Sequence, residues 1–351
     1  MNKQMHLFGT ETQLERLSKL GDPLLKINQL IDWEMFRSHI ENAIRKDMSK
    51  GGRPPYDAIL MFKITMLQQW YGLSDMAIEY QVNDRVSFCR FLGLEFGDTV
   101  PDGNTIWDFK EALKEKEVDR KLFQLFNEML EKQGIITHKG SIIDATFVTV
   151  PKRHTTKKDD EHLKAGESLE DLPAQCIQRQ VNGEIKAFSN VIAQIDTDAR
   201  WAKKGDDTYF GFKNHAKCDS QSKIIVDFRV TDASVHDSRK FVELIGPKDN
   251  DVSVDCAYSS DELRKEILAK YPNIKLHVCA RASRNTPLTD DDKAQNRAIA
   301  RTRARIEHIF GYMSRFMNGI TSRVHGTERV TRDVAAKNLA YNLKRYVYIV
   351  G

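Results

Sequence analysis

Three acidic residues stand in sequence contexts that are unusual for carboxylates. Asp144 ends the apolar run Ser-Ile-Ile-Asp144, and Asp255 ends the similar run Val-Ser-Val-Asp255. Both runs are typical of short buried strands, where a carboxylate is costly to bury unless it is paired or binds a cation. Glu307 lies in a helical segment whose buried face is marked by Ile306 and Ile309. Glu307 therefore borders that face and is able to point toward a sheet.

Carboxylates that converge at strand ends repel one another unless a cation lies between them. Their hard oxygen ligands suit Mg²⁺, with Mn²⁺ as its substitute. Two such ions about 4 Å apart activate a water or a 3′-hydroxyl and stabilise the leaving oxygen in phosphoryl transfer. We therefore predict that Asp144, Asp255 and Glu307 are catalytic and bind metal. For each acid alone, a helix cap or an ion pair with a nearby Arg is the alternative.

Cations and aromatic residues near these acids fit contacts to a phosphate backbone. Arg303 and Glu307 are i and i+4 on one helical face, which fits either an ion pair or a phosphate contact. Arg281 and Arg284 extend the same predicted phosphate-binding track. Trp201 precedes Lys203-Lys204, so it either stacks on an unpaired base or anchors its loop to the core.

Two further pairs of residues have an open interpretation. Lys213 and His215 alternate with apolar residues on a predicted strand, so they share a face on which they approach a nucleic acid. His236-Asp237 precedes a short helical segment and reads as a helix cap, with a position near the active site as the alternative. His236 is the weaker metal ligand of the two because hard metals prefer oxygen.

The periodicity of apolar residues changes from helical to strand-like at Gly134. Residues 1–134 are predicted to be an all-helical region for DNA binding or dimerisation, with a helix-turn-helix-like part at about 56–93. Residues 135–325 alternate strands and helices in the order of a ribonuclease H-like α/β mixed sheet. A polar, charged insertion at about 152–200 is interpreted as an excursion from that fold, mobile without a ligand. Residues 326–351 are predicted to be a helix packed on the core.

Bulk composition restricts the class of protein further. The chain has 351 residues, a net charge of +4, 40% hydrophobic and 30% charged residues, which is typical of a globular protein without a membrane-spanning run. The segment Met-Asn-Lys-Gln-Met-His-Leu-Phe8 has no apolar signal core, so we expect no export. Five widely spaced cysteines without a CxxC pair give little support to zinc ribbons or disulfide frameworks. A basic Gly- and Pro-rich loop around Arg53 is a further DNA-binding candidate.

Ordered motifs run through nearly the whole sequence. They are Gly52-Arg-Pro-Pro-Tyr56, Tyr71-Gly-Leu-Ser-Asp75, Phe91-Leu-Gly-Leu94, Val100-Pro-Asp102 with Thr105, Asp144-Ala-Thr146, Ala199-Arg-Trp201, Gly211-Phe-Lys213 with His215, His236-Asp-Ser238, Asp255 with Tyr258, and Arg303-x-x-x-Glu307-His-x-Phe310. On these motifs the chain resembles insertion-sequence DDE transposases of the IS-five family. The resemblance places Asp144, Asp255 and Glu307 on the family's catalytic acids. Many relatives carry a Lys seven residues after the Glu; here that position is Ser314, and Arg315 beside it is the nearest cation.

The resemblance implies a function with defined partners. A transposase of this kind binds the inverted-repeat ends of its element, cleaves them and joins the 3′ ends to target DNA, using Mg²⁺ or Mn²⁺. Its partner is double-stranded DNA, on which it assembles as a homodimer or higher homo-oligomer, in the bacterial or archaeal cytoplasm with the nucleoid. Two alternatives are a non-catalytic DNA-binding protein derived from a transposase and a ribonuclease H-like nuclease without strand transfer.

Overall fold

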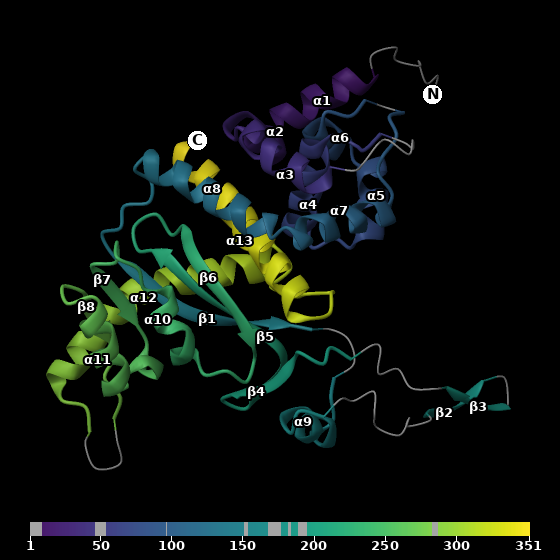
Figure 1. The fold of residues 1–351 in the computed structure, drawn as a ribbon. Helices are drawn as coiled ribbons and strands as arrows, with labels where there is room; N and C mark the ends of the chain where they lie inside the picture. The colour runs from purple at the N-terminus through teal and green to yellow at the C-terminus, as the bar shows by residue number, and fades with distance from the viewer. Residues whose placement is uncertain are drawn as a thin grey trace.

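The computed structural model describes residues 9–45, 54–95, 97–150, 154–167, 177–181, 184–188, 195–282 and 287–351. Helices make up the N-terminal part, and a mixed sheet with further helices follows (Figure 1). The N-terminal helices are α1 (Gly9–Lys19), α2 (Pro23–Leu30), α3 (Arg37–Ile44), α4 (Ala58–Tyr71), α5 (Asp75–Asp84), α6 (Val86–Leu92), α7 (Gly103–Glu115) and α8 (Val118–Lys132), with a 3-10 helix at Trp33–Phe36.

Helix α4 is the most deeply buried of the N-terminal helices and contacts α3, α5, α6 and α7. Its first turn is capped by Asp57, which accepts two backbone N–H groups at 2.9 Å. Its last turn ends at Gly72, whose φ of 64° is in the left-handed region. Phe62 of α4 packs against Phe36 and Trp33, with ring centroids 4.9 and 6.0 Å apart. These aromatic contacts build the core of the helical part around α4.

Six strands form the main sheet. They are β1 (Ser141–Thr149), β4 (Arg200–Lys204), β5 (Asp207–Asp219), β6 (Ile225–Asp232), β7 (Asp251–Val254) and β8 (Lys275–Val278). Strand β1 is central, antiparallel to β5 and parallel to β7, while β6 and β4 pair antiparallel with β5 and β8 pairs parallel with β7. The path β6-β5-β1-β7-β8, antiparallel and then parallel, is the ribonuclease H-like arrangement. The predicted fold class is therefore confirmed.

Four helices accompany this sheet: α10 (Phe241–Leu244), α11 (Asp261–Lys270), α12 (Asp290–Phe316) and α13 (Thr327–Val350). Helix α11 is the crossover that the parallel pair β7–β8 requires. Helix α12 contacts β1 and β7, and α13 contacts β6, α8 and α4. Of the helices that the structure describes, none has the length and apolar character to cross a membrane.

Helix α13 joins the helical part to the sheet through buried side-chain amides. Asn338 accepts a hydrogen bond from Asn214 of β5 at 3.1 Å. Asn342 accepts from the backbone N–H of Ile225 at 2.9 Å, donates to the backbone oxygen of Ile225 at 2.8 Å, and donates to Asn127 of α8 at 3.0 Å. Both α13 amides are fully buried. Because these hydrogen bonds are directional, they fix the axial position of α13 against the sheet.

The predicted insertion holds secondary structure in the residues that can be described. Helix α9 (Lys157–Lys164) begins with a capping box between Thr156 and Asp159, and β2 (Ile177–Val181) pairs with β3 (Glu184–Phe188) in a separate hairpin. Helix α9 lies near β4, whereas the β2–β3 hairpin stands apart from the main sheet (Figure 1). The end of the insertion returns to the fold as β4. Neither the helix nor the hairpin was predicted from sequence, although the capping box is a signal for the start of the helix within this charged segment.

Close approach of Gly72 to Asn318 generates a stability prediction. A Cβ on Gly72 would lie 2.4 Å from the Asn318 Cβ, whereas Gly93, at a similar φ of 73°, has open space around it. We expect Gly93→Ala to lower the free energy of unfolding by about 1–2 kcal/mol through backbone strain alone. Gly72→Ala should lose about 1–3 kcal/mol more through the added clash. Urea unfolding measures both, and equal losses would contradict the contact.

Burial of Lys337 generates a pH prediction. Its ammonium donates to the backbone oxygens of Gln69 at 2.9 Å and Met317 at 2.6 Å, and burial lowers its pKa from 10.5 to about 8. Between these pH values the unfolded chain binds more protons than the folded one, so this group makes stability rise with pH, by about 3 kcal/mol at most. Lys337→Met should remove that rise in urea unfolding, while the surface variant Lys248→Met keeps it. Parallel pH profiles for Lys337→Met and the wild type would refute this.

Candidate active site

The three predicted acids line one cleft of about 700 Å³. Asp144 is in the middle of the central strand β1, and Asp255 directly follows β7. Ser141 pairs with Val252 in the parallel register, and the same offset carries Asp144 to the level of Asp255. Glu307 reaches the cleft from α12, the helix that contacts both strands. The fold therefore brings together the two strand acids and the helix acid.

Local backbone contacts hold both strand acids. Asp144 accepts from the N–H of Ala145 at 2.8 Å, and Asp255 accepts from the N–H of Ala257 at 2.8 Å as it caps a short 3-10 helix. Each carboxylate uses one oxygen, Oδ1, for this bond. The other oxygen, Oδ2, is left to face Arg303 in the cleft.

Arg303 is the counter-ion of the two strand acids. Its Nη2 lies 3.0 Å from Asp144 Oδ2 and 4.0 Å from Asp255 Oδ2. Burial raises the pKa of Asp144, and the guanidinium opposes that rise. Burial would lower the pKa of Arg303, but the two carboxylates outweigh it and the pKa is raised. The ion pair and the phosphate contact predicted for Arg303 are compatible with each other, because a guanidinium that is paired with these acids still has further N–H donors for a phosphate.

Glu307 differs from the strand acids because it is exposed. The buried face of α12 is formed by Ile306, Ile309 and Met313, each 0% exposed, and Glu307 stands at the border of that face. It takes part in no hydrogen bond or ion pair with the residues that the structure describes. Glu307 is thus available to an incoming ligand, as the amphipathic pattern predicts.

The donor set of the cleft fits a divalent cation in its chemistry. Carboxylate oxygens are the ligands that Mg²⁺ and Mn²⁺ prefer, and the two strand acids already hold a cationic group, Arg303, between them. Across the described ranges, however, no three His, Cys, Asp or Glu side chains are grouped closely enough to hold an ion. The acids share a cleft without forming a compact cluster, and Arg303 carries the compensating charge.

The predicted nucleic-acid contact of His215 is wrong in this structure. His215 is 0% exposed, its Nε2 lies 2.9 Å from the Thr231 hydroxyl, and burial lowers its pKa to about 4. Lys213 is half-buried, 2.9 Å from Asp237 and 2.8 Å from the backbone oxygen of Val235. Strand alternation correctly placed Lys213 and His215 on one face, but it did not show that this face is covered.

His236 and Trp201, two other residues singled out in the sequence, make contacts within the protein. His236 caps Ser238, as the helix-cap interpretation states. Trp201 donates to the backbone oxygen of Thr155 at 3.0 Å and packs against His154 and Phe210. Those contacts are the ones expected of an anchored loop.

The remaining predicted cations lie on the surface or outside the described ranges. Arg281, after β8, and Arg315, in the last turn of α12, are both exposed. Ser314 lines the cleft and its neighbour Arg315 does not, since one residue turns a helix by about 100°. Arg53 and Arg284 lie outside the residues that the structure describes.

Several cleft residues were missed by reasoning from sequence. Phe147 of β1 stacks on Tyr209 of β5, with centroids 4.1 Å apart, and Lys204 and Thr321 complete the same wall. In the antiparallel register of β1 and β5, Phe147 lies opposite Lys213. This register determines which residues of β5 lie close to Phe147. Alternation along β5 was a usable signal for Tyr209, but the register against β1 was required to place it.

Comparison with known families agrees with this geometry. Residues 12–112 match a family described as Transposase domain (DUF772), and residues 136–343 match the family described as Transposase DDE domain. Since the second match covers more than half of the chain, the protein belongs to the DDE transposases. It is a DNA transposase of the insertion-sequence type, which confirms the resemblance at that level. DDE transposases use divalent metals.

One solved structure was also found to be similar. It is the cryo-EM structure of the piggyBac transposase synaptic complex with hairpin DNA, at 11% identity and a TM-score of 0.44. The match covers 93% of this chain and 75% of that chain.

The ion pair at Arg303 generates a prediction for Asp144. Arg303→Met removes the positive charge that opposes the effect of burial, so the pKa of Asp144 should rise further above its usual range. Carboxyl-carbon NMR titration measures the change, with Arg315→Met as the control for a cation on the same helix outside the cleft. An unchanged Asp144 titration in Arg303→Met would show that the ion pair does not form in solution.

Proposed function

We propose that this transposase binds the ends of an insertion sequence, cleaves them and joins their 3′ ends to target DNA, with Asp144, Asp255 and Glu307 as the catalytic, metal-binding acids. The observation that carries the proposal is their convergence on one cleft from the central strand, the adjacent parallel strand and α12. The bound ions, Mg²⁺ or in its place Mn²⁺, would activate the attacking oxygen and stabilise the leaving one.

The chain's own residues divide the remaining work. Arg303 holds the charge of the two strand acids and presents guanidinium donors to a phosphate in the cleft. Lys204 lines the cleft, whereas Arg315 does not, so Lys204 is the better candidate for the cation that replaces the family's Lys at Ser314. Lys213 and Arg281 remain secondary candidates for DNA contacts.

The wider arrangement follows the same proposal. We assign residues 1–134 to DNA binding or dimerisation, 135–325 to catalysis and 326–351 to a helix that supports the catalytic part. From the sequence motifs we assign the protein to the IS-five group, and we propose that it acts on double-stranded DNA as a homodimer or larger assembly in a bacterial or archaeal cytoplasm. The proposed reaction acts on both ends of the element, and one chain supplies only one set of catalytic acids. We therefore expect at least a dimer.

Cleavage assays on DNA that carries the element's own ends test the catalytic assignment. Asp144→Asn, Asp255→Asn and Glu307→Gln should each reduce nicking and strand transfer about 10³-fold or more, because charge at the reacting phosphate is no longer stabilised. Glu262→Gln, an exposed acid on α11, should leave the rates unchanged. Thermal unfolding of each variant checks that the loss is chemical. Full activity in any of the three would remove that acid from the mechanism.

The same assay separates the alternatives. Chelation should stop the reaction, and Mg²⁺ or Mn²⁺ should restore it. Joined strands among the products identify a transposase mechanism, simple cuts identify a nuclease, and end-specific binding without any cut identifies a non-catalytic DNA-binding protein.

A further inference from the structure

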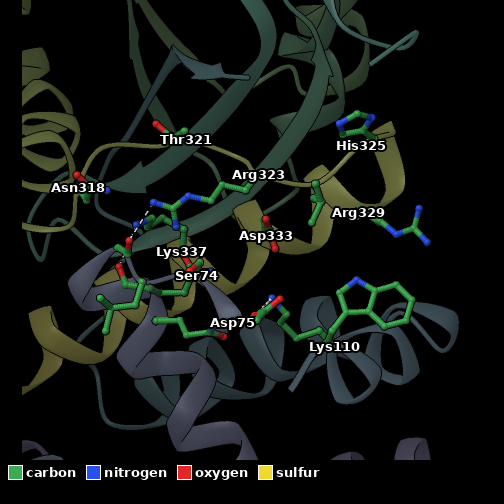
Figure 2. A pocket seen from close by; sticks show the side chains of 16 residues that line it. Ser74, Asp75, Lys110, Asn318, Thr321, Arg323, His325, Arg329, Asp333 and Lys337 are labelled. Atoms are coloured by element: carbon green, nitrogen blue, oxygen red, sulfur yellow. Dashed lines mark hydrogen bonds and ion pairs between the residues drawn. The ribbon is translucent and has the colours of Figure 1, made fainter. Parts of the chain in front are cut away.

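A second cleft lies between the helical part and the α12–α13 segment. Its volume is about 390 Å³, and its walls come from the α4–α5 turn, α7, residues 318–325 and the first half of α13. Figure 2 shows Arg323 extending across this cleft, with Asp333 and Lys337 of α13 close to it and Asp75 and Lys110 on the opposite wall.

The second cleft shares a wall with the active site. Thr321 lines both clefts. The segment that carries Thr321 is fixed to the end of β1, because Thr149 donates its N–H to Ile320 at 3.1 Å and accepts the N–H of Ser322 at 3.1 Å. The strand that bears Asp144 thus ends at this wall. A chain-like ligand bound at the acids is able to continue into the second cleft across Thr321.

The charge of the second cleft is positive and only partly neutralised. Lys110 is paired with Asp75 at 2.5 Å, and Arg329 is paired with Glu111 at 2.7 Å. Arg323 instead donates to the backbone oxygen of Gly72 at 3.1 Å.

Lys337, as described above, also bonds only to backbone oxygens, and neither it nor Arg323 has a carboxylate hydrogen-bond partner among the described residues. The nearby carboxylate of Asp333 is engaged by Arg332 and by Ser322. Arg323 and Lys337 therefore line the cleft without a hydrogen-bonded carboxylate. An anionic ligand would supply the negatively charged hydrogen-bond acceptor that these two cations lack.

The indole of Trp107 and the imidazole of His325, which both line the cleft, indicate which class of anionic ligand fits there. Trp107 is 45% exposed, whereas Trp33 and Trp70 are 5% and 1% exposed. The Nε2 atom of His325 is buried and has no hydrogen-bond partner in the described structure, which leaves a polar atom for a ligand. Cations beside an exposed indole form the combination that binds the backbone and a base of a nucleic-acid strand.

We propose that the second cleft binds a backbone phosphate of the DNA strand held at the catalytic acids, through Arg323 and Lys337, with Trp107 against the adjoining nucleotide. This inference rests on the proposed function, because the strand is the one that the active site cuts. According to this proposal, the cleft between the helical and catalytic parts binds the DNA strand next to the active site. Arg323 and Trp107 are exposed, so their replacement leaves the core intact.

Binding of a fluorescein-labelled DNA duplex with a single-stranded extension tests the proposal. The full chain is titrated in chelator, which prevents cleavage, over a series of salt concentrations. Arg323→Ala should weaken binding about tenfold and reduce the slope of log affinity against log salt by about 1. Arg323→Lys should restore the slope. Arg264→Ala, an exposed arginine on α11, should behave as the wild type.

Tryptophan fluorescence tests the base contact separately. DNA should quench wild-type emission, and Trp107→Phe should lose the quenching while it keeps the affinity. Trp107→Ala should weaken binding about tenfold through lost stacking. A titration with inorganic phosphate alone covers the other source of the anion, and Arg323-dependent binding of phosphate with unaltered DNA binding would overturn the proposal.

Failure of this inference differs from failure of the proposed function. If the wild type binds and cuts DNA while Arg323→Ala and Trp107→Ala match Arg264→Ala, the second cleft is not a DNA site and the catalytic assignment stands. If the wild type neither binds nor cuts DNA that carries the element's ends, both proposals are overturned.

Discussion

The buried polar face of α13 is the constraint on which the rest of the structure depends. An amide taken out of water without a partner costs about 1–3 kcal/mol, so Asn342 is stable inside only where β6 and α8 present complementary groups, while Asn338 accepts one hydrogen bond from Asn214 of β5. Apolar contacts along α13 are close-packed but less directional than these hydrogen bonds. Directional bonds hold α13 in one register, and the preceding segment with Thr321 is held with it.

Charge balance explains how the active cleft exists in a folded chain before a ligand arrives. Asp144 lies in the central strand, where its burial disfavours ionisation, and Asp255 stands at the same level of the next strand. Arg303 offsets this repulsion from one helical turn before Glu307. In the proposed mechanism Arg303 also contacts a phosphate of the DNA. A divalent ion would then replace Arg303 as the partner of Asp144 and Asp255, and neither the carboxylates nor the guanidinium would be left without an opposite charge.

Features that depend on local sequence patterns could be predicted from the sequence, whereas features that depend on tertiary packing could not. The order of strands and helices was sufficient to predict the ribonuclease H-like core, and the acids at the ends of apolar runs were sufficient to predict that Asp144 and Asp255 lie in one cleft. His215 was misassigned because alternation by two defines a face but not what covers it. The second cleft was beyond prediction, since its walls are separated by more than two hundred residues of sequence, and Arg323 has no local motif.

The two clefts have opposite charge, which bears on how DNA would be held. Without metal, the acids would repel a phosphate backbone, and among the described residues that line the active cleft only Arg303 and Lys204 are cations that counter them. The second cleft attracts the backbone directly, because Arg323 and Lys337 have no hydrogen-bonded acid among the described residues. Binding before catalysis would thus depend on the cleft beside Thr321, and divalent ions would then extend the attraction to the acids. Such an order keeps the strand positioned before the reactive charges are assembled around it.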